Sequence, residues 1–242
     1  MNRLFDAQSS IPFTAYSLSH IITLVILAVL AALLYLFRAQ LRKDRSGRTV
    51  RIGLILILAC SEISLNAWYV WQDRYNAKDT LPLELCTISL YLSVFMLIFN
   101  SRRLLQIVYF IGIGGAMQAM LTPALDYGFP HYRFIEFFAA HIAIILAVLY
   151  MVWVEQCRPT LKSIFLTMGF LNLLLIVVGS INFLTGGNYM FLARKPETAS
   201  LLDVLGPYPW YLLSLEVVAF VLFLLLYLPI AISNRRHRTL QL

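Results

Sequence analysis

The sequence contains seven apolar stretches, each long enough to cross a lipid bilayer as a helix. They lie at about residues 17–37, 50–71, 82–99, 104–124, 134–154, 161–183 and 209–232. A helix that crosses the hydrocarbon core needs about 20 mostly apolar residues, and a lipid-embedded run of this length can satisfy its backbone polar groups only as a helix. We therefore expect one all-α membrane domain over residues 1–242, built as a bundle of seven transmembrane helices.

The composition agrees with this class of protein. Hydrophobic residues make up 60% of the 242 residues and charged residues only 13%, whereas soluble domains carry about 25% charged residues. The net charge of +7 does not indicate nucleic-acid binding, because the basic residues sit between the apolar stretches and build no continuous face. The first apolar stretch is too long for the core of a signal peptide, so we expect it to be retained.

The basic residues also predict an orientation. Thirteen of the nineteen Lys and Arg residues flank the stretches on one side, in the segments 38–51, 102–103, 158–162 and 235–238. The positive-inside rule places this side in the cytoplasm. We therefore expect a cytoplasmic C-terminus and an N-terminus outside, which an odd number of spans requires.

Polar side chains within the apolar stretches gather near the outer ends of the expected helices, and the inner halves are expected to be almost purely apolar. Taking the third helix to begin at Pro82, Cys86 lies about 6–7 Å below the outer end. His141, counted from Phe134, lies about 10 Å below the outer end. A thiol and a base at similar depth on two helices are the minimum for nucleophilic catalysis. We therefore expect Cys86 to be the nucleophile and His141 its base.

Each of the two residues also has a plainer interpretation. A free cysteine is most often a small buried hydrophobe, and Cys86 stands out only because a helix N-terminus lowers the pKa of a thiol. A single histidine in a helix is often just hydrogen-bonded to a nearby carbonyl. Glu84, two residues from Cys86, falls on a different face of the helix and is expected to turn toward the outer loops or toward Arg74 or Lys78.

Further polar residues are expected to bind or orient a substrate at the same site, or to serve as polar contacts between helices. Cys86, Ser89 and Ser93 form one stripe. Arg194 and Lys195 lie in a long outer loop rich in aromatic residues and proline, which suits a flap at the level of the lipid headgroups or a simple linker. The candidates for a substrate-binding or orienting role are Glu62, Asn66, Ser89, Gln118, Asn182, Arg194 and Lys195.

The sequence indicates neither a phosphate-binding loop nor a zinc site. The glycine-rich run Gly112–Gly115 lies inside an apolar stretch without a lysine, so its spacing indicates close helix packing rather than phosphate binding. The four histidines show no spacing typical of a zinc site. We expect no metal and no cofactor.

Several short motifs together resemble the YwaF-like bacterial integral membrane proteins. They are Leu81–Cys86, Gly112–Ala119 with Thr122-Pro123, Phe137–His141, Asn188–Met190 with Lys195-Pro196, and Gly206–Tyr211, and the resemblance extends over about residues 15–230. That family is similar to a eukaryotic seven-helix, cysteine-dependent acyltransferase that moves fatty acyl chains between phospholipids without CoA to make ether lipids.

The resemblance implies that Cys86 carries an acyl group and that His141 activates it. The implied partners are membrane phospholipids and lysophospholipids, and the implied location is the bacterial cytoplasmic (inner) membrane. Two alternatives remain open. With water as acceptor the same site is a lipid hydrolase, and without catalysis the protein binds or transports a small amphiphile. The last alternative predicts polar residues that continue into the cytoplasmic half, or broken helices.

Overall fold

The computed structural model describes residues 4–8, 11–43, 45–195 and 204–239, with side chains up to position 233. Every named secondary-structure element of the described chain is a helix. Its elements are α1 (Leu18–Leu36), α2 (Arg38–Lys43), α3 (Arg45–Trp71), α4 (Leu85–Ile98), α5 (Arg102–Leu121), α6 (Tyr132–Trp153), α7 (Leu161–Thr185), the 3₁₀ turn η1 (Tyr189–Phe191) and α8 (Trp210–Thr239).

Six helices in the described chain are long and apolar enough to cross a membrane, namely α1, α3, α5, α6, α7 and α8. The third predicted span is the exception, because its helix α4 has only 14 residues and is therefore about 21 Å long. Each of the seven predicted stretches contains one helix, so the all-α membrane fold is confirmed, with six candidate spans and one shorter apolar helix.

Two helix boundaries differ from those predicted. Pro82 does not begin α4, because residues 81–84 form a turn in which the Leu83 N–H donates to the Leu81 carbonyl oxygen at 2.7 Å. The helix begins at Leu85 with Glu84 as its N-cap. Helix α3 begins at Arg45, five residues before the predicted apolar stretch, because helical geometry continues past the point at which the side chains stop being apolar.

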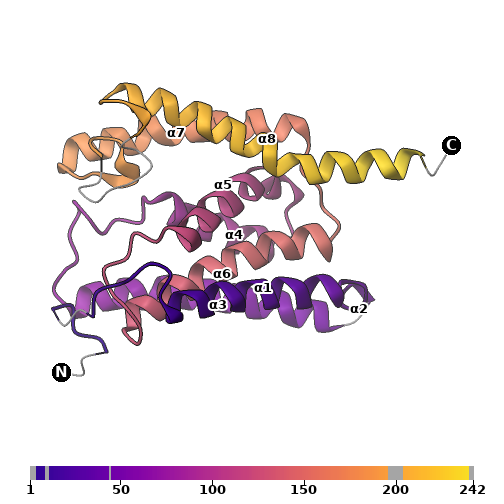
Figure 1. Cartoon of the computed structure of the whole chain (residues 1–242), viewed down its shortest axis with the longest axis horizontal. Coiled ribbons are helices and arrows are strands. Elements are labelled where there is room, and N and C mark those ends of the chain that lie inside the picture. Colours follow the sequence, from indigo (N-terminus) through magenta and orange to yellow (C-terminus); the bar gives the residue numbers. More distant parts are fainter. Residues whose placement is uncertain (1–3, 9–10, 44, 196–203, 240–242) are drawn as a thin grey trace.

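The helices form three layers (Figure 1). Helices α7 and α8 lie on one side and α1 with α3 on the other, while α4, α5 and α6 lie between them. Helix α5 contacts α4, α6, α7 and α8 and so forms the centre of the bundle. The N-terminus and the C-terminus lie at opposite ends (Figure 1), and we call these the N-terminal end and the C-terminal end of the bundle.

Glycines on α5 let neighbouring helices approach closely. A Cβ atom at Gly112 would lie 3.3 Å from Val148 of α6, and one at Gly114 would lie 3.2 Å from Leu222 of α8. A Cβ atom at Gly115 would lie 3.8 Å from Leu85 of α4. The expectation of close packing is confirmed, and the three glycines serve three different neighbours.

The C-terminal half of the bundle is less apolar than predicted. The Ser163 hydroxyl of α7 donates to the Gln106 side chain of α5, and the Thr167 hydroxyl donates to the Gln106 carbonyl oxygen at 3.2 Å. Ser163 and Thr167 are buried. These groups satisfy one another between α5 and α7, so they stabilise helix packing and form no open polar path.

The segment before α1 packs over the N-terminal end of the bundle. The Trp68 indole donates to the Phe5 carbonyl oxygen at 2.8 Å, and His131 Nε2 lies 3.3 Å from the Asp6 carbonyl oxygen. His131 Nδ1 accepts from the Arg133 backbone N–H. Burial lowers the pKa of His131, so the neutral imidazole is the form that holds this segment in place.

Candidate functional site

Cys86 is the second residue of α4, so it lies closer to the helix N-terminus than the predicted start at Pro82 implied. Its side chain points toward α5, with Sγ 4.0 Å from the position that a Cβ atom on Gly115 would take. Because Gly115 has no side chain, space is left beside the sulfur. The thiol is half-buried, whereas Cys60 is exposed and Cys157 is buried.

Gln118 lies one helical turn beyond Gly115 on the same face of α5. Its side-chain Nε2 donates to the Thr122 hydroxyl at 2.6 Å, and that hydroxyl donates to the Gln118 carbonyl oxygen at 3.1 Å. Both residues are exposed, although Gly114 on the adjacent strip of α5 is covered by α8. The polar edge of α5 beside Cys86 is therefore open.

The turn η1 lies over the start of α4. Glu84 Oε2 accepts from the Met190 backbone N–H at 3.2 Å. The Tyr189 hydroxyl donates to the Ala77 carbonyl oxygen at 3.0 Å and accepts from the Leu81 N–H at 2.8 Å. Burial raises the pKa of Tyr189, so the phenol keeps the proton that it donates. Glu84 thus turns toward the outer loop, as expected, and holds this loop close to the N-terminus of α4, where Cys86 lies.

Asn182 holds the same turn against α7. Its Nδ2 donates to the Tyr189 carbonyl oxygen at 3.0 Å, and its Oδ1 accepts from the Tyr189 N–H at 2.9 Å. Asn182 is buried. Its side-chain amide donates one hydrogen bond to the backbone of Tyr189 and accepts one from it. Asn182 therefore affects the candidate site indirectly, because it fixes the position of the loop that contains Tyr189.

Arg194 and Lys195 follow the turn. The Asn188 side-chain oxygen accepts from the backbone N–H groups of Ala193 and Arg194 at 3.1 and 3.0 Å, and this fixes the path of the loop. The Arg194 side chain is exposed. Lys195 Nζ lies 5.7 Å from the centre of the Tyr211 ring, within the range of a cation–π contact. The basic pair therefore lies at the N-terminal end of the bundle.

His141 is buried in α6 with 7% of its surface exposed. Its Nδ1 lies 2.6 Å from the Phe137 carbonyl oxygen, and a carbonyl can only accept, so we assign the proton to Nδ1. The ring also packs on Phe137, with 4.2 Å between the ring centres. Nε2 has no hydrogen-bond partner in the described part of the chain, which leaves it as a free acceptor.

The helices that carry Cys86 and His141 meet, because α4 packs against α6 as well as against α5. Their contact is the geometric condition that the predicted pair requires. Among the described residues, the Cys86 thiol and the His141 imidazole form no hydrogen bond with each other. Hydrogen bonds of a catalytic pair are often long without substrate, and the pairing of these two residues stays a prediction.

Glu62 of α3 is the centre of a buried hydrogen-bond network. Its Oε1 accepts from Asn66 Nδ2 at 2.8 Å and from the Tyr91 hydroxyl of α4 at 2.7 Å. Asn66 Nδ2 also donates to the Glu62 carbonyl oxygen at 2.9 Å. Glu62 and Asn66 therefore form a pair one helical turn apart on α3, and Tyr91 connects this pair to the helix that carries Cys86.

Three further residues near this network, Tyr91, Arg133 and Glu136, are not among the predicted site residues. Arg133 and Glu136 of α6 form an ion pair one turn apart, and the Arg133 guanidinium lies 5.9 Å from the Trp68 ring centre. The Tyr132 hydroxyl donates to the Ser64 hydroxyl at 2.6 Å. The i, i+3 spacing of Arg133 and Glu136 was a usable signal, whereas Tyr91 had no signal in the sequence.

The serine stripe on α4 is buried. The Ser89 hydroxyl donates to the Leu85 carbonyl oxygen at 2.7 Å, as serines in apolar helices commonly do. The Ser93 hydroxyl is fully buried and has no hydrogen-bond partner within the described part of the chain. In the described residues no group of three His, Cys, Asp or Glu side chains could hold a metal ion.

A bundle of apolar helices with buried polar networks near one end is a polytopic α-helical membrane protein. The model of the TMEM164 family matches residues 15–227, and the chain belongs to that family. No curated protein and no solved structure matches the chain.

Proposed function

We propose that the protein is an intramembrane acyltransferase that acts on phospholipids without CoA through a thioester on Cys86. The observation that carries this proposal is the position of Cys86. The thiol is half-buried in the first turn of α4, beside Gly115, which has no side chain to cover it, and close to a loop tied to Glu84. The thiolate is the reactive form of a cysteine, so the thiol proton needs an acceptor, and in this proposal His141 takes that role.

The proposed topology has seven spans, with the N-terminus outside and the C-terminus in the cytoplasm. It is supported by the thirteen basic residues on the cytoplasmic side and by termini at opposite ends of the bundle (Figure 1). Helix α4 then crosses with the help of residues 81–84. The proposed site lies near the outer leaflet, and the YwaF-like resemblance supports a location in the bacterial cytoplasmic membrane.

The first half-reaction forms the thioester. His141 Nε2 accepts the thiol proton, and the Cys86 sulfur attacks the carbonyl carbon of a phospholipid ester. The new C–S bond forms as the ester C–O bond breaks. The imidazolium of His141 returns its proton to the departing glycerol oxygen, so a lysophospholipid leaves.

The second half-reaction reverses these steps with an acceptor. The hydroxyl of a lysophospholipid gives its proton to His141 and attacks the thioester carbon, and the C–S bond breaks to restore the thiolate. The imidazolium then reprotonates the sulfur. If water takes the place of the lysophospholipid, the product is a free fatty acid and the protein is a lipid hydrolase. The acceptor alone separates these two activities.

The other candidates support this chemistry from around the pair. Through Tyr91, Glu62 and Asn66 hold α3 against α4, which orients the helix that carries the nucleophile. Gln118 is the exposed donor closest in sequence to Gly115 and binds the substrate carbonyl in this proposal. Ser89 and Asn182 position α4 and the loop, respectively, while Arg194 and Lys195 contact the lipid phosphate.

A non-enzymatic binding or transport protein for a small amphiphile is the alternative. Polar residues in the C-terminal half are the feature that it predicts, and the contacts of Gln106 with Ser163 and Thr167 are of that kind. They are closed between α5 and α7 and give the alternative limited support. The binding or transport hypothesis requires no reactive thiol.

Acyl exchange in reconstituted vesicles tests the proposal. The protein is incorporated with a phospholipid labelled in one acyl chain and an unlabelled lysophospholipid, and label in the new phospholipid is measured. Cys86→Ala should abolish the exchange, while the matched variant Cys60→Ala, at an exposed position, should retain it. Exchange by Cys86→Ala at the parental rate would refute the thioester route. Free labelled fatty acid in place of phospholipid would identify a hydrolase.

A further inference from the structure

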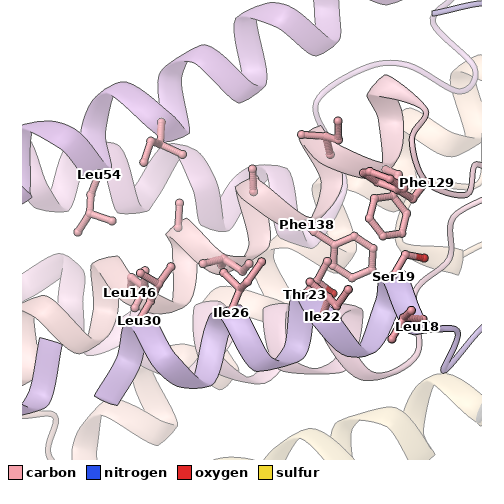
Figure 2. A pocket seen from close by; sticks show the side chains of 16 residues that line it. Leu18, Ser19, Ile22, Thr23, Ile26, Leu30, Leu54, Phe129, Phe138 and Leu146 are labelled. Atoms are coloured by element: carbon pink, nitrogen blue, oxygen red, sulfur yellow. The ribbon is translucent and has the colours of Figure 1, made fainter. Parts of the chain in front are cut away.

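A cavity of about 590 Å³ lies between α1, α3 and α6. In Figure 2, α1 supplies one wall through Leu18, Ile22, Ile26 and Leu30, and α6 supplies the facing wall, including Phe138 and Leu146. Leu54 of α3 lies toward one end of the cavity, and Phe129 lies at the other. Ile22 and Ile26 remain 48% and 43% exposed, so the cavity is a groove that opens to the surroundings of the bundle.

The shape of the groove suits a single hydrocarbon chain. Its wall on α1 runs from Leu18 to Leu30 and its wall on α6 from Phe134 to Leu146. Each covers twelve residue steps, or about 18 Å of helix. A volume of 590 Å³ over that length corresponds to a channel about 6 Å across. A helix with its side chains is about 10–12 Å wide, so a helix could insert only side chains, whereas a hydrocarbon chain can lie along the whole groove.

The chemistry of the groove is equally selective. Its only polar lining residues are Ser19 and Thr23. The Ser19 hydroxyl lies 3.1 Å from that of Ser17, and the Thr23 hydroxyl donates to the His20 carbonyl oxygen at 2.7 Å. Neither hydroxyl is left without a partner. A polar ligand would lose its hydration without gaining hydrogen bonds, so the occupant is apolar.

The position of the groove connects it to one leaflet. It begins at the N-terminal end of α1 and ends at Leu30, about two-thirds of the way along that helix. Half of the hydrocarbon core is about 15 Å thick, close to the 18 Å length of the groove. Lipid chains are the surroundings at this depth, and they are the molecules that can enter.

We propose that this groove is a binding site for one acyl chain of a phospholipid in the leaflet at the N-terminal end. It is separate from the Cys86 site, because α1 packs on α6 whereas Cys86 points toward α5. On α6, His141 lies about 110° around the helix from the centre of the groove-facing strip. The lipid in this groove is a bound structural lipid and is not the substrate of the proposed acyl transfer.

Photo-crosslinking tests the proposal. The full-length protein is reconstituted in phosphatidylcholine vesicles that contain a trace of phosphatidylcholine with a diazirine in one acyl chain. After illumination, adducts are mapped by mass spectrometry of peptides. We expect adducts concentrated on residues 18–30 and 134–146. The helices α7 and α8 present more exposed apolar side chains, such as Phe183 at 88% and Val217 at 64%, and equal or stronger labelling there would overturn the proposal.

A matched pair of variants makes the test independent of simple exposure. Ile22→Trp fills the groove, while Val177→Trp makes the same kind of change at a similarly exposed position on α7 (46%). Ile22→Trp should lower labelling of residues 134–146 severalfold, and Val177→Trp should leave it unchanged. If Ile22→Trp fails to fold, Ala139→Leu narrows the same groove by a smaller change. Undiminished labelling in the folded groove variant would contradict a bound chain.

Discussion

The hydrogen bond between Tyr91 and Glu62 connects α4 to α3, and its removal is the most direct test of how the N-terminal half of the bundle is held together. Tyr91→Phe removes a single oxygen atom, which donates to Glu62 Oε1 at 2.7 Å. Glu62 keeps its second donor, Asn66, at 2.8 Å. The carboxyl is therefore not left without a partner, and the loss measures one bond.

The expected size follows from the kind of bond. A hydrogen bond to a charged group contributes about 1.5–3 kcal/mol, and the half-buried Tyr91 belongs near the lower limit. A loss of about 2 kcal/mol lowers the Tm of a chain of this size by roughly 4–8 °C. The measurement is thermal unfolding in detergent, followed by intrinsic fluorescence.

Tyr227→Phe is the matched control. Tyr227 is also a half-buried tyrosine in a helix, and its hydroxyl makes no hydrogen bond among the described residues. Its removal should change the Tm by no more than about 1–2 °C, since a substitution away from such contacts changes stability by about 0.5 kcal/mol or less. A double-mutant cycle with Glu62→Gln should give a coupling of about 0.5–3 kcal/mol. Equal Tm losses in the two Phe variants, or zero coupling, would refute the network.

Three further predictions concern other parts of the molecule. Gly115→Ala should stabilise the protein by about 0.5–1 kcal/mol, because alanine favours the helix and its Cβ meets its neighbours at 3.8–4.0 Å. Gly114→Ala should stabilise the protein less than Gly115→Ala, because Leu222 would lie 3.2 Å from the new Cβ atom. The Tm of each variant measures its stability, and a larger increase in Tm for Gly114→Ala would contradict this packing. Asn182→Ala leaves two backbone groups of Tyr189 without partners at a cost of about 1–3 kcal/mol each, and hydrogen exchange of residues 186–195 should quicken; exchange at the parental rate would contradict the role of Asn182. Because the pKa of His131 is lowered by burial, its contribution is complete above the unfolded-state pKa of about 6.5 and is lost as the pH falls below that value. Proteolysis of residues 4–8 should therefore increase between pH 7 and pH 5, His131→Gln should weaken this pH dependence, and a response that the variant leaves unchanged would contradict it.

Much of the fold could be predicted because hydropathy alone defines membrane helices. Each predicted apolar stretch contains a helix, and the glycines of α5 lie at close contacts. The start of α4 could not be predicted in the same way. Residues 81–84 are apolar enough to extend the helix, but the Leu81 N–H is bonded to Tyr189, a residue 108 positions away.

The candidate site was predictable only in part. Polar residues in apolar stretches are conspicuous, so Glu62, Asn66 and His141 could be found from the sequence. Their partners depend on how each helix is rotated and shifted against its neighbours, which spacing along one helix does not determine. Tyr91 could therefore not be predicted as a partner of Glu62, although it donates a hydrogen bond to that carboxyl. The proximity of Cys86 to Gly115 likewise brings together two motifs on different helices, α4 and α5.

The central claim is that Cys86 carries an acyl group as a thioester. Intact-protein mass spectrometry after incubation with a phospholipid of defined acyl chain tests it most directly. We expect an added mass of one acyl group on Cys86, and neutral hydroxylamine should remove it. The added mass should be absent in Cys86→Ala and present in Cys157→Ala. With His141→Ala the adduct should form much more slowly. An unmodified Cys86 in protein that is actively exchanging acyl chains would contradict the account.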